Sequence, residues 1–114
     1  MVGNSYWILI TDKKDYEEYK EMLENIIALA HREVATICNG GISDWNLVQI
    51  ESIILPEMEE LIQHVSEGHL FLKYGRHQRL LESTYMLTDL LNKIAKTPLG
   101  VQITMLQGKI NSQK

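Results

Sequence analysis

Residues 12–41 read DKKDYEEYKEMLENIIALAHREVATICNGG, a continuous helical pattern followed by a stop signal. The apolar residues of this stretch recur at steps of three and four, so they line one face of a helix. Thr11 or Asp12 can cap its N-terminus, and the Asn-Gly-Gly at 39–41 tolerates the left-handed conformation of a C-terminal cap. At 1.5 Å per residue this helix is about 40 Å long, and we expect it to be the spine of the domain.

A second helical pattern begins after a short loop. Ser43 or Asp44 can cap it, and its apolar residues keep helical phase as far as Val65. Pro56 lies inside this pattern, where a proline loses one backbone hydrogen bond and clashes with the preceding turn. We therefore expect either a kink near Leu55 or two helices, the second beginning at Pro56.

The rest of the chain adds one short extended stretch and two further helical patterns. Residues 69–74 form a candidate strand that can pair with residues 6–10, although periodicity over so few residues does not decide it. Residues 76–96 are apolar around most of the circumference and predict the most buried helix. Thr97-Pro98 opens a last helix with a narrow apolar stripe. That stripe consists of Leu99, Ile103, Leu106 and Ile110.

Length and composition are typical of one globular domain. The chain has 114 residues, of which 45% are hydrophobic and 23% charged. With the patterns above, this predicts a mainly α, four- or five-helix bundle-like single domain over residues 1–114, with a minor two-stranded β element left open. Cys38 is the only cysteine, so no internal disulfide can form, and no stretch approaches the roughly twenty apolar residues that span a bilayer. We therefore expect a cytosolic protein without membrane association.

Charge is divided unevenly along the chain. Residues 1–64 hold four Lys and Arg against twelve Asp and Glu, a net charge of −8, whereas residues 65–114 hold seven against three, a net charge of +4. Such asymmetry favours electrostatic recognition of a partner. The carboxylates expected to meet a basic partner are Glu17, Glu18, Glu21 and Glu24 on the first helix, and Glu57, Glu59 and Glu60 on the second. The simpler interpretation of these residues is a solvated helix face.

A smaller basic cluster offers a different partner. Lys73, Arg76, His77 and Arg79 alternate with Phe71 and Tyr74, a combination suited to stacking on single-stranded nucleic acid. The net negative charge of the chain disfavours this interpretation, because phosphate-backbone affinity requires a basic surface.

Catalytic and metal-binding motifs are not found. His31, His64, His69 and His77 are scattered, and neither a His-Glu-x-x-His run nor a paired Cys motif exists. Cys38 falls beside Ile37 on the apolar face, where we expect a buried small hydrophobic residue. Trp7 and Trp45 lie at element edges, where core packing is favoured over a role as binding anchors. We therefore expect no enzyme activity, no metal and no cofactor.

One stretch carries a family resemblance. Lys73-Tyr74-Gly75, Arg79-Leu80-Leu81-Glu82-Ser83-Thr84-Tyr85 and Thr97-Pro98-Leu99-Gly100 together resemble small helical bacterial proteins encoded as immunity partners of secreted toxins. The resemblance covers about residues 73–106, under a third of the chain. It implies a non-enzymatic cytosolic protein that binds and blocks one toxin domain.

Three functions from different classes are therefore compared. The first is an immunity or inhibitor protein whose acidic helix face blocks a basic partner protein. The alternative is a structural or regulatory helical module that self-associates through an exposed side of Leu99, Ile103 and Leu106. A nucleic-acid-binding regulator that uses Lys73, Arg76 and Arg79 is a third.

Overall fold

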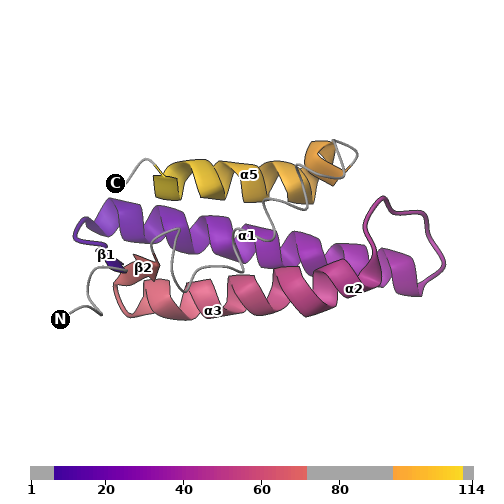
Figure 1. Ribbon diagram of the computed structural model, residues 1–114, viewed down its shortest axis with the longest axis horizontal. Coiled ribbons are helices and arrows are strands. Elements are labelled where there is room, and N and C mark those ends of the chain that lie inside the picture. Colours follow the sequence, from indigo (N-terminus) through magenta and orange to yellow (C-terminus); the bar gives the residue numbers. More distant parts are fainter. Residues whose placement is uncertain (1–6, 72–93, 112–114) are drawn as a thin grey trace.

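A computed structural model of the chain describes residues 7–71 and 94–111, and these residues are mainly helical, as the sequence predicted (Figure 1). The longest helix, α1 (Lys13–Cys38), has α3 (Leu55–Ser66) on one side and α5 (Pro98–Asn111) on the other. The expected spine is therefore confirmed, because the two neighbours pack on α1.

The core follows the length of α1. The apolar stripe predicted for α1 contains seven residues, and the structure buries four of them, Tyr19, Leu23, Ile26 and Ala30. The other three, Tyr16, Val34 and Ile37, are half-buried. Most of the helix expected over residues 76–96 lies outside the described residues. The same holds for the residues of the basic cluster, Lys73, Tyr74, Arg76, His77 and Arg79. The described end of this segment, Ile94–Lys96, forms a 3-10 turn that brings Ile94 into the core.

Both predicted ends of α1 are confirmed. The Asp12 carboxylate accepts a hydrogen bond from the Lys14 backbone N–H at 2.8 Å, which satisfies one of the free donors of the first turn. At the other end, Gly41 N–H bonds to the Thr36 carbonyl at 2.8 Å, and Gly40 adopts φ 81°. This is a Schellman-type ending, in which the left-handed residue turns the chain out of the helix.

The left-handed position gives a first prediction. Gly40→Ala is expected to lower the free energy of unfolding by about 1 kcal/mol, because a Cβ is disfavoured in this conformation although nothing lies within 4 Å of it. Gly40→Asn is the control, since asparagine tolerates positive φ, and it should cost less. Urea denaturation measures both variants, and equal costs would contradict a backbone origin.

The second helical pattern starts later than expected. Asn46, not Ser43 or Asp44, caps the short helix α2 (Leu47–Gln49), and Gln49 completes a capping box by accepting from the Asn46 backbone N–H at 2.8 Å. Ser43 is used differently. Its hydroxyl accepts from the Trp45 backbone N–H at 3.0 Å and donates to the Glu33 carboxylate at 2.5 Å, tying the loop to α1.

Pro56 meets the second of the two expectations to within one residue, because α3 begins at Leu55 with Pro56 in its first turn, although no break separates it from the helical turns before it. The helical backbone runs on from α2 through a π-helical turn, Ile50–Ile54, into α3, and Pro56 lies in the first turn of α3 (Figure 1). The Leu55 backbone N–H reaches back to the Ile50 carbonyl. A wider turn before the proline relieves the clash and the missing hydrogen bond that an α-helical turn would impose.

Two short strands tie the ends of the helices together. β1 (Trp7–Leu9) pairs antiparallel with β2 (His69–Phe71), with Ile8 opposite Leu70. The Ile10 backbone N–H extends the pairing to the Gly68 carbonyl at 2.8 Å, and Gly68 has a φ of 91°. The pairing between residues 6–10 and 69–74 that the sequence left open is therefore present in this part of the chain, and it sets the entry to α1 beside the exit from α3.

The last helix corrects one expectation. Leu99, Ile103 and Leu106 are 1%, 0% and 0% exposed, so they cannot form a self-association surface. They face inward because α5 packs against α1. The predicted start is confirmed, since the Thr97 hydroxyl accepts from the Gly100 backbone N–H at 3.1 Å.

Candidate partner-binding surface

The glutamates of α1 do not form a purely acidic face. Glu17, Glu21 and Glu24 are exposed, as predicted. Exposed lysines lie on the same helix: Lys13 and Lys14 precede Glu17, and Lys20 lies between Glu17 and Glu21. Opposite charges at this spacing largely cancel at the distance of an approaching partner, so the outer face of α1 is a weaker electrostatic target than its glutamates alone suggest.

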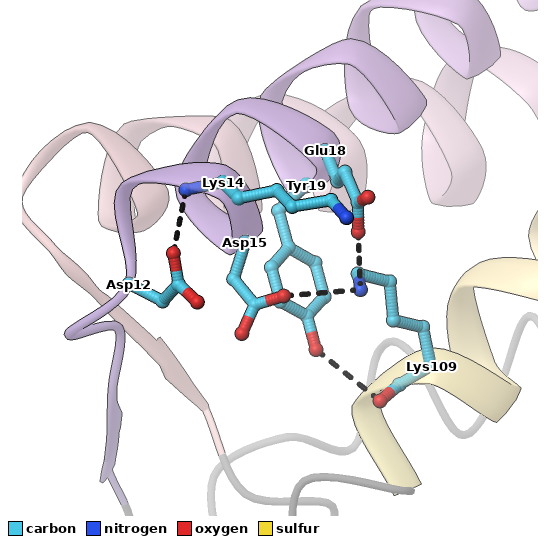
Figure 2. A network of polar contacts seen from close by, with 6 residues as sticks. All are labelled: Asp12, Lys14, Asp15, Glu18, Tyr19 and Lys109. Atoms are coloured by element: carbon cyan, nitrogen blue, oxygen red, sulfur yellow. Dashed lines mark hydrogen bonds and ion pairs between the residues drawn. The ribbon is translucent and has the colours of Figure 1, made fainter.

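Glu18 is half-exposed, but its carboxylate is engaged within the chain. Figure 2 shows its carboxylate accepting a hydrogen bond from the Lys109 ammonium at 2.9 Å, with the Asp15 carboxylate 3.6 Å from the same nitrogen. The ammonium also lies 4.8 Å from the centroid of the Tyr19 ring, and the Tyr19 hydroxyl donates to the Lys109 backbone carbonyl at 3.2 Å. The charge of Glu18 is thus engaged within the chain, and Glu18 is removed from the predicted surface.

The pKa values of this pair reflect the same contact. The hydrogen bond from Lys109 lowers the pKa of the Glu18 carboxyl, and the hydrogen bond to Glu18 raises the pKa of the Lys109 ammonium. Both charged forms are therefore favoured in the folded chain. The cluster fixes the last turns of α5 against the first turns of α1, so its role is to hold the two helices in register.

This cluster predicts a pH-dependent loss of stability. Lys109→Met should destabilise the fold at pH 7 and cost less at pH 3, because the stabilisation from a carboxylate with a lowered pKa is lost as the pH falls through and below its ordinary value of 4.5. The raised pKa of the Lys109 ammonium sets the limit at high pH. The stabilisation from this group is lost as the pH rises above 10.5, the ordinary pKa of a lysine. Urea denaturation at the two pH values checks this. Lys20→Met, at an exposed lysine, should change little; an equal cost of Lys109→Met at both pH values would contradict the ion-pair origin.

Glu57 is a second correction to the predicted surface. Its side chain is 2% exposed, between the buried residues Leu55 and Met58 of α3. The apolar pattern of the sequence predicted which side of the helix faces the core, but it did not predict how wide the buried face is. Glu57 lies at the edge of that face. It cannot contact a partner.

The outer side of α3 retains the remaining predicted residues. Glu59 and Glu60 are exposed, opposite the buried Met58, Leu61 and Val65. The whole stretch 42–68 contains six carboxylates and no lysine or arginine. Five of the six are exposed, and we call them the α2–α3 acidic surface: Asp44, Glu51, Glu59, Glu60 and Glu67.

Three of these five were missed by sequence reasoning. The prediction for this segment was restricted to Glu57, Glu59 and Glu60, so Asp44, Glu51 and Glu67 were left out. The sequence itself contains a feature that could have identified them: residues 42–68 include no lysine or arginine. Charge balance within a segment is therefore the sequence signal that marks these five carboxylates.

Other candidate chemistry finds little support among the described side chains. Cys38 is exposed, which corrects the expectation that it is buried; it lies in the last turn of α1, about 100° around the helix from Ile37. Trp45 is 4% exposed, so its expected packing role is confirmed.

Within residues 7–71 and 94–111, no group of three or more His, Cys, Asp or Glu could hold a metal ion. In the same part of the chain, no helix combines the length and apolarity needed to cross a membrane.

Comparison with known proteins adds no relative. No protein-family model matches this chain, and neither a curated protein nor a solved structure is similar to it.

Proposed function

We propose that this chain is a non-enzymatic, cytosolic immunity or inhibitor protein that blocks a basic partner protein through acidic helix faces. One observation carries the proposal: the α2–α3 acidic surface comes from a 27-residue stretch, 42–68, without a single lysine or arginine. A segment with several exposed carboxylates and no lysine or arginine attracts a positively charged partner from a distance and accelerates its capture.

The α2–α3 acidic surface is the main contact in this proposal, and the exposed glutamates of α1 are secondary. Glu17, Glu21 and Glu24 stand among lysines, whereas Glu59 and Glu60 stand beside Gln63 and Ser66, which are uncharged. The proposal thus keeps five of the seven predicted residues and places the larger part of the attraction on α3.

The toxin-domain partner is supported by two further points. The resemblance over residues 73–106 implies immunity function, although residues 73–93 lie outside the described residues. Toxin active sites that handle nucleic acid are commonly basic, and a row of carboxylates mimics the phosphate backbone that such sites bind. A toxin domain of this kind is therefore the partner class that we propose.

The complete architecture is part of the same proposal. The apolar pattern of residues 76–96 supports one more helix, which would join α1, α3 and α5 in a four- or five-helix bundle. An inhibitor that presents rigid helix faces needs no cofactor.

A pull-down from the source cell's lysate tests the proposal with two charge-matched variants. Glu51→Lys/Glu59→Lys/Glu60→Lys alters the α2–α3 acidic surface, and Glu17→Lys/Glu21→Lys/Glu24→Lys makes the same charge change on α1. The wild type is expected to retain a basic protein at low salt and to release it at high salt. The first variant should lose this protein, and the second should retain most of it.

The two variants also separate surface from net charge. Equal loss in both would show that only overall charge matters, and loss in the α1 variant alone would move the contact to α1. Either result, or capture of no basic protein by the wild type, contradicts the proposed contact. Circular dichroism of both variants confirms that helix content is unchanged before the comparison.

A further inference from the structure

Asn39 and Gly40, which end α1, form a dipeptide with a chemistry of its own. Of the six asparagines in the chain, only Asn39 precedes a glycine. The backbone nitrogen of the following residue can attack an asparagine side chain and close a succinimide ring, and a glycine there lacks the side chain that hinders the attack. Asn39 and Gly40 are both exposed. This is therefore the position in the chain where such a ring closure meets least steric resistance.

The geometry of the helix ending opposes this reaction in the folded chain. At the Asn39 ψ of 11°, the Gly40 nitrogen nearly eclipses the Asn39 backbone nitrogen, so the Asn39 side chain is turned away from the atom that would attack it. The Gly40 N–H must lose its proton for the attack, and it donates to the Ile37 carbonyl at 3.1 Å. The Gly41 N–H bond to the Thr36 carbonyl, 2.8 Å long, holds the same turn. Ring closure therefore requires the last turn of α1 to open first.

We propose that Asn39 is a site of irreversible deamidation and that the ending of α1 controls its rate. When the turn opens, the Gly40 nitrogen bonds to Cγ of Asn39, the Cγ–Nδ2 bond breaks, and ammonia leaves with the proton of the Gly40 N–H. Water then opens the succinimide at either of its two carbonyls, which leaves an aspartate or an isoaspartate at position 39. Water is the only co-reactant, so the reaction needs neither an oxidant nor an enzyme.

Both products disfavour the return of the same helix ending. An aspartate places a negative charge at the C-terminus of α1, where the helix dipole is also negative and the last turn has no basic residue to offset it. An isoaspartate routes the main chain through the former side chain, so the Gly40 and Gly41 N–H groups lose their alignment with the carbonyls of the last turn. The modification is therefore a one-way loosening of the junction between α1 and the loop that carries the buried Trp45.

Gly41 offers a way to open the ending without changing the reacting pair. A Cβ at Gly41 would lie 2.8 Å from the Thr36 Cγ2 methyl and 3.0 Å from the Thr36 carbonyl oxygen. The methyl is held in place, because the Thr36 hydroxyl donates to the Arg32 carbonyl at 3.0 Å and a β-branched side chain has few alternative rotamers. Gly41→Ala therefore destabilises the closed ending and leaves Asn39 and Gly40 intact. This inference does not rest on the proposed function.

Peptide mass spectrometry of the full chain, incubated at mildly alkaline pH, tests the proposal. Wild-type deamidation at Asn39 should be at least about tenfold slower in buffer than in guanidinium, because only the opened fraction reacts. Gly41→Ala should raise the rate in buffer by about fivefold or more and leave the rate in guanidinium unchanged. Gly68→Ala is the matched control. It strains a residue with a φ of 91° at the opposite end of α1, so the rate in buffer should stay at the wild-type value (Figure 1).

Two further measurements separate the chemistry from its control. Gly40→Ala adds a side chain to the attacking residue and should slow deamidation in guanidinium, whereas the isolated isoaspartate form should unfold at a lower urea concentration than the unmodified chain. Equal wild-type rates in buffer and in guanidinium would overturn control by the helix ending. Equal acceleration by Gly41→Ala and Gly68→Ala would also overturn it, since global unfolding would then set the rate. If circular dichroism shows that Gly41→Ala does not fold, the wild-type comparison still decides.

Discussion

Leu106→Ala is expected to lower the free energy of unfolding by about 2–5 kcal/mol, whereas Met105→Ala, one residue earlier, should change it by less than about 0.5 kcal/mol. Leu106 is 0% exposed and Met105 is 54% exposed. Removal of a buried leucine side chain loses its transfer free energy and leaves a cavity against α1, while an exposed methionine has little to lose.

Urea denaturation measures both variants. The two substitutions lie in the same helix and leave the same residue type, so helix propensity cannot explain a large difference between them. Similar costs for both would contradict the orientation of α5 that buries Leu99, Ile103 and Leu106.

Trp45→Ala is expected to cost about 3–5 kcal/mol. Trp45 is 4% exposed, and its indole N–H donates to the Thr97 hydroxyl at 3.0 Å. The Thr97 hydroxyl in turn donates to the Ile94 carbonyl at 2.6 Å and accepts from the Gly100 N–H at 3.1 Å. Trp45 therefore links the loop before α2 to the first turn of α5, 52 residues further along the chain.

The hydrogen bond can be separated from the packing. Trp45→Phe keeps an aromatic ring in the core but removes the donor, and a double-mutant cycle with Thr97→Val isolates the coupling between the two side chains. We expect a coupling free energy of about 1 kcal/mol, the usual net value of one hydrogen bond. Additive effects in the cycle would show that Trp45 contributes by packing alone.

Local features of the fold were predictable from the sequence. The apolar stripe of α1, its Asp12 cap and its glycine ending all depend on residues within a few positions of each other, and all three are confirmed. The cap of α2 was misplaced by two or three residues, because Ser43, Asp44 and Asn46 are each good cap residues. Only Asn46 has Gln49 three residues later to complete a capping box.

Most long-range features were not predictable, although the pairing of residues 6–10 with 69–74 was among the possibilities that the sequence left open. Lys109 neutralises Glu18 across 91 residues of sequence, and periodicity carries no information on such a pair. Glu57 was misassigned for a related reason: a helical stripe gives the direction of the core, whereas the width of the buried face depends on what packs against it. The inward side of α5 likewise depends on its packing on α1, which placed Leu99, Ile103 and Leu106 in the core instead of on the surface.

The corrected charges also explain why the candidate surface moved. The sequence weighted α1 because four glutamates share one helix face, but Lys109 engages Glu18, and three exposed lysines, Lys13, Lys14 and Lys20, lie on the same helix. Residues 42–68 contain six carboxylates and no lysine or arginine. Net charge over an exposed segment, not the number of carboxylates, decides which face attracts a basic partner.

The most direct test of the proposed function is the association rate of the captured basic protein, measured by stopped flow or biolayer interferometry across a salt series. For the wild type the rate should fall steeply as salt rises, because screening shortens the reach of the carboxylates. Glu51→Lys/Glu59→Lys/Glu60→Lys should slow association at low salt by about tenfold or more and flatten the salt dependence. A rate and slope unchanged from the wild type in this variant would contradict recognition by the α2–α3 acidic surface.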